Sequence, residues 1–178
     1  MIPMLKEESF HLGTGQDGIK RIVKAEVIPL PIIQKYINKW VPVSLDLFGV
    51  DRSSSAHWFY VWGLKGRYDE PTATAEANLE RMNEHSREIY RQECVKLVEM
   101  INKNVPDGKA KLYVPDAKFN RFIGEHARKP YSVTGEMLSE EKHAEHLKAM
   151  LPQPEDVALV GEIQAVEKQW ISPKGSIL

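Results

Sequence analysis

The sequence predicts a mainly α-helical protein with a smaller mixed segment near its C-terminus. Apolar residues recur at helical spacing over long stretches, and Pro and Gly interrupt this pattern at intervals. The clearest case is the range 74–102, where apolar residues lie three, four, seven or eight positions apart. Turn-rich, extended sequence begins only after residue 106. We therefore expect a helical part over residues 1–105 and a C-terminal appendage over residues 106–178 that packs on it.

The first forty residues are expected to form three short helices. Residues 1–12 have a helical pattern, which Gly13-Thr14-Gly15 is expected to interrupt and residues 17–27 to resume. A further helix over residues 31–40 follows, because Pro suits the first turn of a helix. This helix is expected to close before Pro42, since proline has no backbone amide to continue the hydrogen bonds.

Residues 43–65 form the most aromatic stretch of the chain, and we expect this stretch to be buried. Ser53-Ser54-Ser55 lies within it without the glycines of a nucleophile elbow, so packing or helix capping is the expected role of these serines. The longest run without a charged residue, Ser53 to Leu64, is too short to cross a bilayer. The large apolar residues of the stretch are Leu45, Leu47, Phe48, Trp58, Phe59, Val61, Trp62 and Leu64.

Turn signals follow the helix over residues 74–102. Pro106-Asp107-Gly108 is expected to end it, and residues 112–115 have an extended pattern. A second turn, at Thr134-Gly135, lies within the range 131–138.

Two C-terminal helices complete the prediction. Ser139 is a candidate N-cap, and Glu140 and Glu141 are acids of the first turn, where they complement the helix dipole. The second helix begins near Pro154, at the first helical position, with two acids after it.

Charge and cysteine content exclude several classes of function. The 24 Lys and Arg residues balance 25 Asp and Glu residues, so a large basic surface for nucleic acid is not expected. Residues 1–8 lack the apolar core of a signal peptide, and no segment is apolar enough to span a membrane. The single cysteine, Cys94, cannot form an internal disulfide. We expect a cytoplasmic protein, in which Cys94 is half-buried and not nucleophilic.

The most informative local motif is Glu8-Ser9-Phe10-His11. A carboxylate and an imidazole three residues apart on a helix lie on one face and can reach the same metal site. Bundles with two carboxylate-bridged irons use two such Glu-x-x-His pairs and two further glutamates. A Glu/His pair is also common on a solvated helix surface, so the motif alone leaves both interpretations open.

Other candidate motifs are better explained by structure. The range 140–143 repeats the Glu-x-x-His spacing, but its acid lies in a first helical turn, and we expect His143 and His146 to be exposed. The Gly-x-Gly sequence at residues 13–15 follows a helix and lacks the Lys-Ser/Thr of a phosphate loop. Neither segment is expected to form a functional site.

Several segments together resemble the oxygenase subunits of benzoyl-CoA 2,3-epoxidases, over a range from the first residues to about residue 173. Their order and spacing agree with that family. The segments over residues 44–49 and 63–68 are far more specific than the metal motif. The segments are Met4-Leu5-Lys6-Glu7-Glu8-Ser9-Phe10-His11-Leu12, Ser44-Leu45-Asp46-Leu47-Phe48-Gly49, Gly63-Leu64-Lys65-Gly66-Arg67-Tyr68 and Phe119-Asn120-Arg121-Phe122-Ile123-Gly124.

The resemblance implies the C-terminal part of a ferritin-like helical bundle that holds two irons. It implies a monooxygenase that uses dioxygen to epoxidise the aromatic ring of benzoyl-CoA. It also implies a separate reductase that supplies electrons from NADPH through FAD and iron–sulfur clusters. Glu8 and His11 would be the carboxylate and the imidazole of the family's second Glu-x-x-His.

This sequence departs from the family in length. Family members carry the other metal ligands on helices that precede the motif, whereas Glu8 here is the eighth residue. About four of the roughly six ligands are therefore missing. We expect the chain to be a fragment or one piece of a split protein, inactive alone and completed by a missing N-terminal half.

Two other functions remain open from the sequence. One is a di-iron oxygenase for another aromatic acyl-CoA, such as phenylacetyl-CoA. The other is a metal-free helical module for acyl-CoA binding or protein interaction. Lys65 and Arg67, near the end of the aromatic stretch, are candidate contacts for a CoA phosphate, although a solvated helix end, which favours cations, is the more common explanation.

Overall fold

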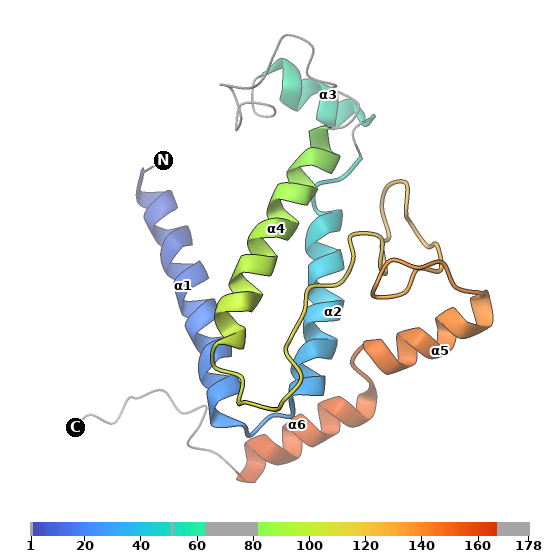
Figure 1. The fold of residues 1–178 in the computed structure, drawn as a ribbon. Coiled ribbons are helices and arrows are strands. Elements are labelled where there is room, and N and C mark those ends of the chain that lie inside the picture. The colour runs from blue at the N-terminus through green and yellow to red at the C-terminus, as the bar shows by residue number, and fades with distance from the viewer. Residues whose placement is uncertain (1, 51, 63–81, 167–178) are drawn as a thin grey trace.

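The chain is described by a computed structural model over residues 2–50, 52–62 and 82–166 (Figure 1). This part is mainly helical, as predicted. It contains no strand, and an isolated antiparallel bridge joins Tyr131 to Met137. The helices are α1 (Ile2–Ala25), α2 (Leu30–Asp46), α3 (Ser54–Val61), α4 (Met82–Asn102), α5 (Glu140–Met150) and α6 (Pro154–Val166).

Three long helices form the frame of the molecule. α4 lies between α1 and α2 and contacts both, and α3 lies beyond the ends of α2 and α4 (Figure 1). α5 packs on the other side of α2, and α6 continues from it in chain order. None of the described helices is both long enough and apolar enough to cross a membrane.

The apolar core lies where the C-terminal ends of α1 and α4 meet the segment that follows α4. Val23 of α1 packs there with Val98 and Ile101 of α4, and Val105 and Leu112 complete the cluster. Each such side chain contributes about 1.5–3 kcal/mol when it is fully buried. Val105 and Leu112 lie on either side of the boundary predicted near residue 106, so both parts of the chain share this core. Whether they are separate domains stays a prediction.

α1 is one continuous helix, and the predicted break at Gly13-Thr14-Gly15 is wrong. A glycine costs about 1 kcal/mol within a helix but ends it only when its backbone leaves the helical region. Gly13 and Gly15 both stay within α1, and neither is among the glycines of positive φ. Packing on α4 outweighs their low helix propensity.

α2 begins near the predicted residue but runs through Pro42 to Asp46, so the predicted end before Pro42 is wrong. A proline removes one hydrogen bond of the helix, which costs about 3 kcal/mol. Leu45 and Asp46, beyond the proline, are both buried and need this last turn to reach the interior. Tertiary contacts therefore decide the length of α2.

The expectation that residues 43–65 are buried is wrong for most of the described stretch. Leu45 has no exposed surface, but Leu47 is 84% exposed and Trp62 is 63% exposed. Leu47 follows the end of α2, and α3 lies at the end of the frame rather than between helices (Figure 1). Ser53 caps α3, as expected, because its Oγ accepts a hydrogen bond from the Ala56 amide at 3.1 Å. Leu64 lies outside the described residues.

α4 ends at Asn102, as predicted. Residues 106–109 form a turn after it, in which the Lys109 amide donates to the Pro106 carbonyl at 3.3 Å. The predicted start of this helix, residues 74–81, lies outside the described part. Residues 112–115 are not a strand. Instead, the Gln34 side chain of α2 pairs with both the amide and the carbonyl of Tyr113, at 2.8 and 2.9 Å. A side chain takes the place of a neighbouring strand.

The C-terminal turn and helices agree with the sequence. Gly135 has a φ of +85° and its amide donates to the Ser132 carbonyl, which confirms the turn at Thr134-Gly135. The hydroxyl of Ser139 caps α5 by accepting from the Lys142 amide at 3.4 Å. α6 begins at Pro154.

Candidate functional site

Glu8 and His11 lie one turn apart on α1. The Oε2 of Glu8 is 3.8 Å from Nδ1 of His11, and the two side chains are 75% and 58% exposed. Another face of α1 contacts α4, where Gln16 donates to the sulfur of Met100 and Val23 enters the core. At about 100° per residue, Glu8 points roughly 70° and His11 roughly 130° away from the direction of Gln16 and Val23. The helix thus presents the pair on a side that the described helices do not cover.

Glu8 and His11 can supply two ligands of a metal site but not a complete set of ligands. A carboxylate and an imidazole on adjacent turns match half of the pattern that carboxylate-bridged di-iron bundles use. Among the residues that the structure describes, no group of three or more potential metal ligands comes together. Any metal held by Glu8 and His11 would need further ligands beyond the described residues.

The second Glu-x-x-His has a different environment. Glu140 is exposed in the first turn of α5, as expected for an acid near a helix N-terminus. His143 and His146, which were expected to be exposed, are half-buried. The residues around the Tyr131–Met137 bridge fold back over this face of α5, and the Val133 amide donates to Nε2 of His146 at 3.0 Å. The sequence pattern of α5 does not indicate that the residues around the bridge pack over these histidines.

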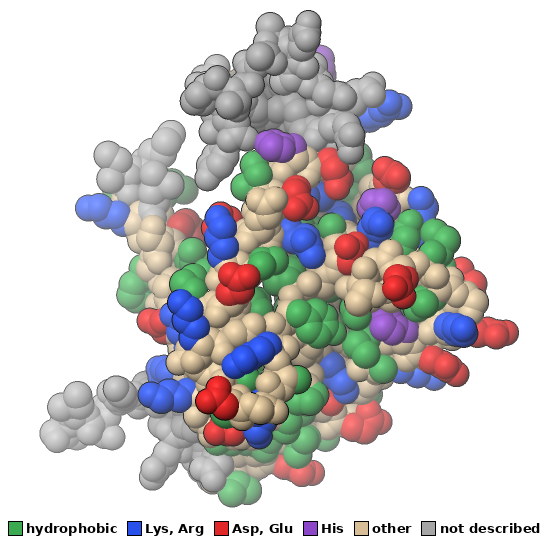
Figure 2. Space-filling model, viewed as in Figure 1, with side chains coloured by type: hydrophobic (Ala, Val, Ile, Leu, Met, Phe, Trp, Pro, Cys, Tyr) green, Lys and Arg blue, Asp and Glu red, His purple; other side chains and the backbone are tan. Residues whose placement is uncertain are grey.

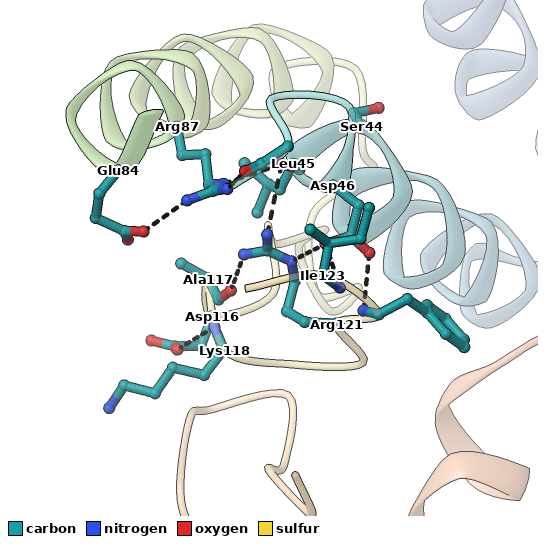
Figure 3. Close-up of polar contacts among 12 residues, drawn as sticks. Ser44, Leu45, Asp46, Glu84, Arg87, Asp116, Ala117, Lys118, Arg121 and Ile123 are labelled. Carbon is teal, nitrogen blue, oxygen red and sulfur yellow. Dashed lines mark hydrogen bonds and ion pairs between the residues drawn. The ribbon is translucent and has the colours of Figure 1, made fainter. Parts of the chain in front are cut away.

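Two of the segments that carry the family resemblance meet in space. The carboxylate of Asp46, at the end of α2, pairs with Nε of Arg121 at 2.6 Å, and both side chains are buried (Figure 3). The same carboxylate accepts hydrogen bonds from the amides of Phe122 and Ile123, at 2.9 and 3.3 Å. Asp46 therefore fixes the backbone of residues 119–124 against the end of α2.

Arg87 of α4 joins the same junction. It donates to the carbonyls of Leu45 and Gly49 and to the Glu84 carboxylate, the last at 2.8 Å (Figure 3). Arg121 also donates to the Leu45 carbonyl, at 3.4 Å. The last carbonyls of a helix lack partners within it and carry partial negative charge, so two guanidinium groups stabilise the end of α2. Arg87 was missed from the sequence, where its only signal is a common three-residue spacing from Glu84.

The glycines that end these segments have a conformational role. Gly49 and Gly124 have φ angles of +70° and +86°, which L-residues with side chains rarely adopt. Arg87 donates to the Leu45 carbonyl, and the Asp46 carboxylate accepts from Arg121 and from the Phe122 amide. The junction, defined by Asp46, Arg87 and Arg121, is therefore a structural element that ties α2, α4 and residues 119–124 together.

Cys94 is half-buried on α4, as predicted. Burial is the main cause that raises the pKa of its thiol, and it also raises the pKa of the neighbouring Tyr90 hydroxyl. A thiol with a raised pKa is a poor nucleophile at neutral pH. The structure gives Cys94 a packing role.

The remaining site prediction lies outside the described residues. Lys65 and Arg67, together with the Gly63–Tyr68 segment, belong to that part of the chain. On the described part of the face in Figure 2, Lys and Arg side chains are interspersed with Asp and Glu, in keeping with the net charge of −1.

Comparison with known proteins links part of the chain to one oxygenase component. No family model matches the sequence. Benzoyl-CoA oxygenase component B from Aromatoleum evansii is 38% identical over 86 residues, in a match that covers 38% of this chain. The match covers 18% of that protein, so the chain corresponds to less than a fifth of its length. This chain is thus similar, in part, to one part of a protein named as component B of a benzoyl-CoA oxygenase.

Proposed function

We propose that this chain is part of the oxygenase component of a di-iron enzyme that epoxidises the aromatic ring of benzoyl-CoA. The observation that carries the proposal is the face of α1 that the described residues leave exposed, on which Glu8 and His11 lie 3.8 Å apart. The similarity to benzoyl-CoA oxygenase component B supports the same assignment. Electrons would come from NADPH through a separate reductase that carries FAD and iron–sulfur clusters.

Glu8 and His11 supply the two ligand types that such a centre requires. A carboxylate can bridge two metal ions, and a neutral imidazole suits a terminal position on one of them. Two bound irons would supply the activation of dioxygen. The exposed α1 face leaves both side chains free to meet ligands from other helices of the oxygenase. Because the carboxylate must be ionised and the imidazole neutral, we expect metal binding to weaken in acid.

The junction would act on the same site indirectly. Asp46 and Arg121 fasten residues 119–124 to the end of α2, and α4 connects that end to α1. A fixed frame holds the Glu8 face in place for the helices that complete the centre. This role would account for the buried ion pair between two of the segments that carry the resemblance.

The test measures iron in the complex of this chain with the remaining part of an oxygenase component. After anaerobic reconstitution with ferrous iron, we expect about two irons per complex. The double variant Glu8→Ala with His11→Ala should lose most of this iron and the benzoyl-CoA-dependent uptake of dioxygen. Glu7→Ala is the matched control, because it removes a neighbouring carboxylate about 100° away around the helix.

Two outcomes would contradict the proposal. Iron content that stays the same in the double variant would remove Glu8 and His11 from the centre. Binding of benzoyl-CoA by the chain alone, with no iron bound in any complex, would favour the metal-free acyl-CoA-binding module instead.

A further inference from the structure

The turn at residues 131–137 is held against α5 by a histidine that acts as a hydrogen-bond acceptor. The Val133 amide donates to Nε2 of His146 at 3.0 Å. The His146 ring also stands edge-on to Phe119, with 6.1 Å between ring centroids, and Phe119 is fully buried. His146 therefore lies between the turn and the buried start of the 119–124 segment.

This hydrogen bond exists only while the imidazole is neutral. A neutral ring has one nitrogen that accepts and one that donates, whereas the imidazolium donates from both. With Nε2 accepting from Val133, the proton of the neutral ring is on Nδ1. Protonation at Nε2 would place two N–H groups face to face and break the contact.

The surroundings of His146 favour the neutral form. Burial is the main cause that lowers its pKa, and the charge of His143, one turn away on α5, lowers it further. Nε2 of His143 is itself buried without a hydrogen-bond partner among the described residues. A positive charge on His143 therefore makes it more costly to charge His146.

Several other titratable groups lie near the turn. On the segment packed against α5, the Asp116 carboxylate accepts from the Lys118 amide at 2.9 Å, and Lys118 lies over the Tyr131 ring. The His126 ring stands edge-on to the Tyr131 ring, with 5.6 Å between their centroids. On α2, Lys35 pairs with Asp156, and on α5 itself Lys142 and Glu145 are exposed. His143 is the titratable group whose charge acts on His146.

The turn connects His146 to the segment that carries Arg121. The Val133 carbonyl accepts from the Asp116 amide at 2.8 Å, and residues 116–124 lead directly to the junction. Within the turn, the Ser132 hydroxyl accepts from the amides of Thr134 and Glu136 at 3.2 and 3.1 Å. The turn is thus a compact unit, tied on one side to α5 and on the other to the start of the 116–124 segment.

We propose that His146 is a pH-operated latch, whose protonation releases the turn at residues 131–137 from α5. The released unit keeps its internal hydrogen bonds, because none of them involves the imidazole. The change is reversible and requires no ligand. It would make the position of residues 116–137 depend on pH within the range in which histidines titrate.

The test follows the Val133 amide by NMR in the full 178-residue chain. Between about pH 7.5 and about pH 5 we expect its protection against hydrogen exchange to fall at least about tenfold, in step with titration of the His146 ring. The carboxylates titrate below this range, so they do not contribute. In His146→Gln the side-chain oxygen can accept at every pH, and the step at Val133 should disappear.

His143→Gln is the matched control, since it removes a histidine one turn away and leaves the acceptor in place. Its Val133 step should persist and move to higher pH, because one opposing charge is gone. A Val133 amide equally protected at both pH values in the unmodified chain would overturn the proposal, whatever the variants do. An unchanged step in His146→Gln would overturn it as well.

Discussion

The carboxylate of Asp46 and the guanidinium of Arg121 lie 2.6 Å apart in the interior of the protein, although 75 positions separate them in the chain. The pair joins the end of α2 to the segment after α4. A buried ion pair contributes little net stability over apolar residues, but removal of one partner leaves an uncompensated buried charge. Its main effect is therefore to fix where residues 119–124 lie.

Replacement of Arg121 tests this relationship. Arg121→Ala leaves Asp46 buried with only backbone amides as partners, so we expect a loss of about 3 to 5 kcal/mol in the free energy of unfolding. Lys129→Ala, which removes an exposed cation of the same segment, should change it by less than about 0.5 kcal/mol. Urea unfolding followed by circular dichroism measures both. Equal effects of the two substitutions would show that the junction is not a rigid tie.

Two glycines provide a matched pair for the C-terminal turn. Gly135 has a φ of +85°, and a Cβ there would lie 2.6 Å from the carboxyl carbon of Asp116. We expect Gly135→Ala to destabilise the protein by about 1 to 3 kcal/mol, through backbone strain and the clash. Gly161, within α6, has open space around its Cβ position, so Gly161→Ala should stabilise by up to about 1 kcal/mol. Thermal unfolding of both variants should show shifts of opposite sign.

The sequence predicted those features that depend on neighbouring residues alone. The Ser139 cap, the start of α6 at Pro154 and the glycine turn at Gly135 each arise from a local steric or hydrogen-bonding preference. Helical periodicity likewise placed the end of α4 at Asn102. In these places local preference and tertiary structure agree.

Predictions failed where distant contacts outweigh local preference. Gly13 and Pro42 are weak helix residues, yet α1 and α2 continue through them because the residues beyond pack into the interior. The exposure of Trp62 and the burial of His146 depend on which distant segments pack against them, and the spacing of residues in the sequence does not show this. The pairing of Asp46 with Arg121 and the bond from Arg87 to the Leu45 carbonyl could not be derived for the same reason. The resemblance marked two of the segments without showing that they meet.

One face of α2 organises the C-terminal part of the chain. Gln34 binds the backbone of Tyr113, and the Asn38 side chain donates to the Met150 carbonyl at 3.0 Å. Asn38 is fully buried and also accepts from Gln34 at 2.8 Å. We expect Asn38→Ala to cost about 1 to 3 kcal/mol, because it leaves polar groups of Gln34 and Met150 without their partner.

Gln92→Ala is the control for this substitution, because it removes an exposed amide whose hydrogen bond, to Glu88, lies within α4. It should be nearly neutral. Hydrogen exchange adds a local readout, since amides of α5 should lose protection in Asn38→Ala before those of α4. Simultaneous loss in both helices would show that α5 does not open separately from the rest.

The ion pair between Lys35 and Asp156 makes stability depend on pH at the start of α6. Lys35 Nζ lies 2.7 Å from Asp156 Oδ2, and the Gln153 amide donates to the same carboxylate at 2.8 Å. The hydrogen bond from Lys35 is the main cause that lowers the pKa of Asp156, and the Gln153 amide adds to it. The folded state therefore holds the carboxylate ionised more strongly than the unfolded chain does.

The sign of the pH effect follows from that lowered pKa. The contribution is fully present above the unfolded pKa of about 4 and is lost as the pH falls through the lower folded value. We expect Lys35→Met to be less stable than the unmodified chain at about pH 7, with a difference that shrinks below about pH 4. Urea unfolding at a series of pH values measures this difference. A difference that stays constant down to about pH 2 would mean that Lys35 acts through packing of its methylene groups and not through the charge of Asp156.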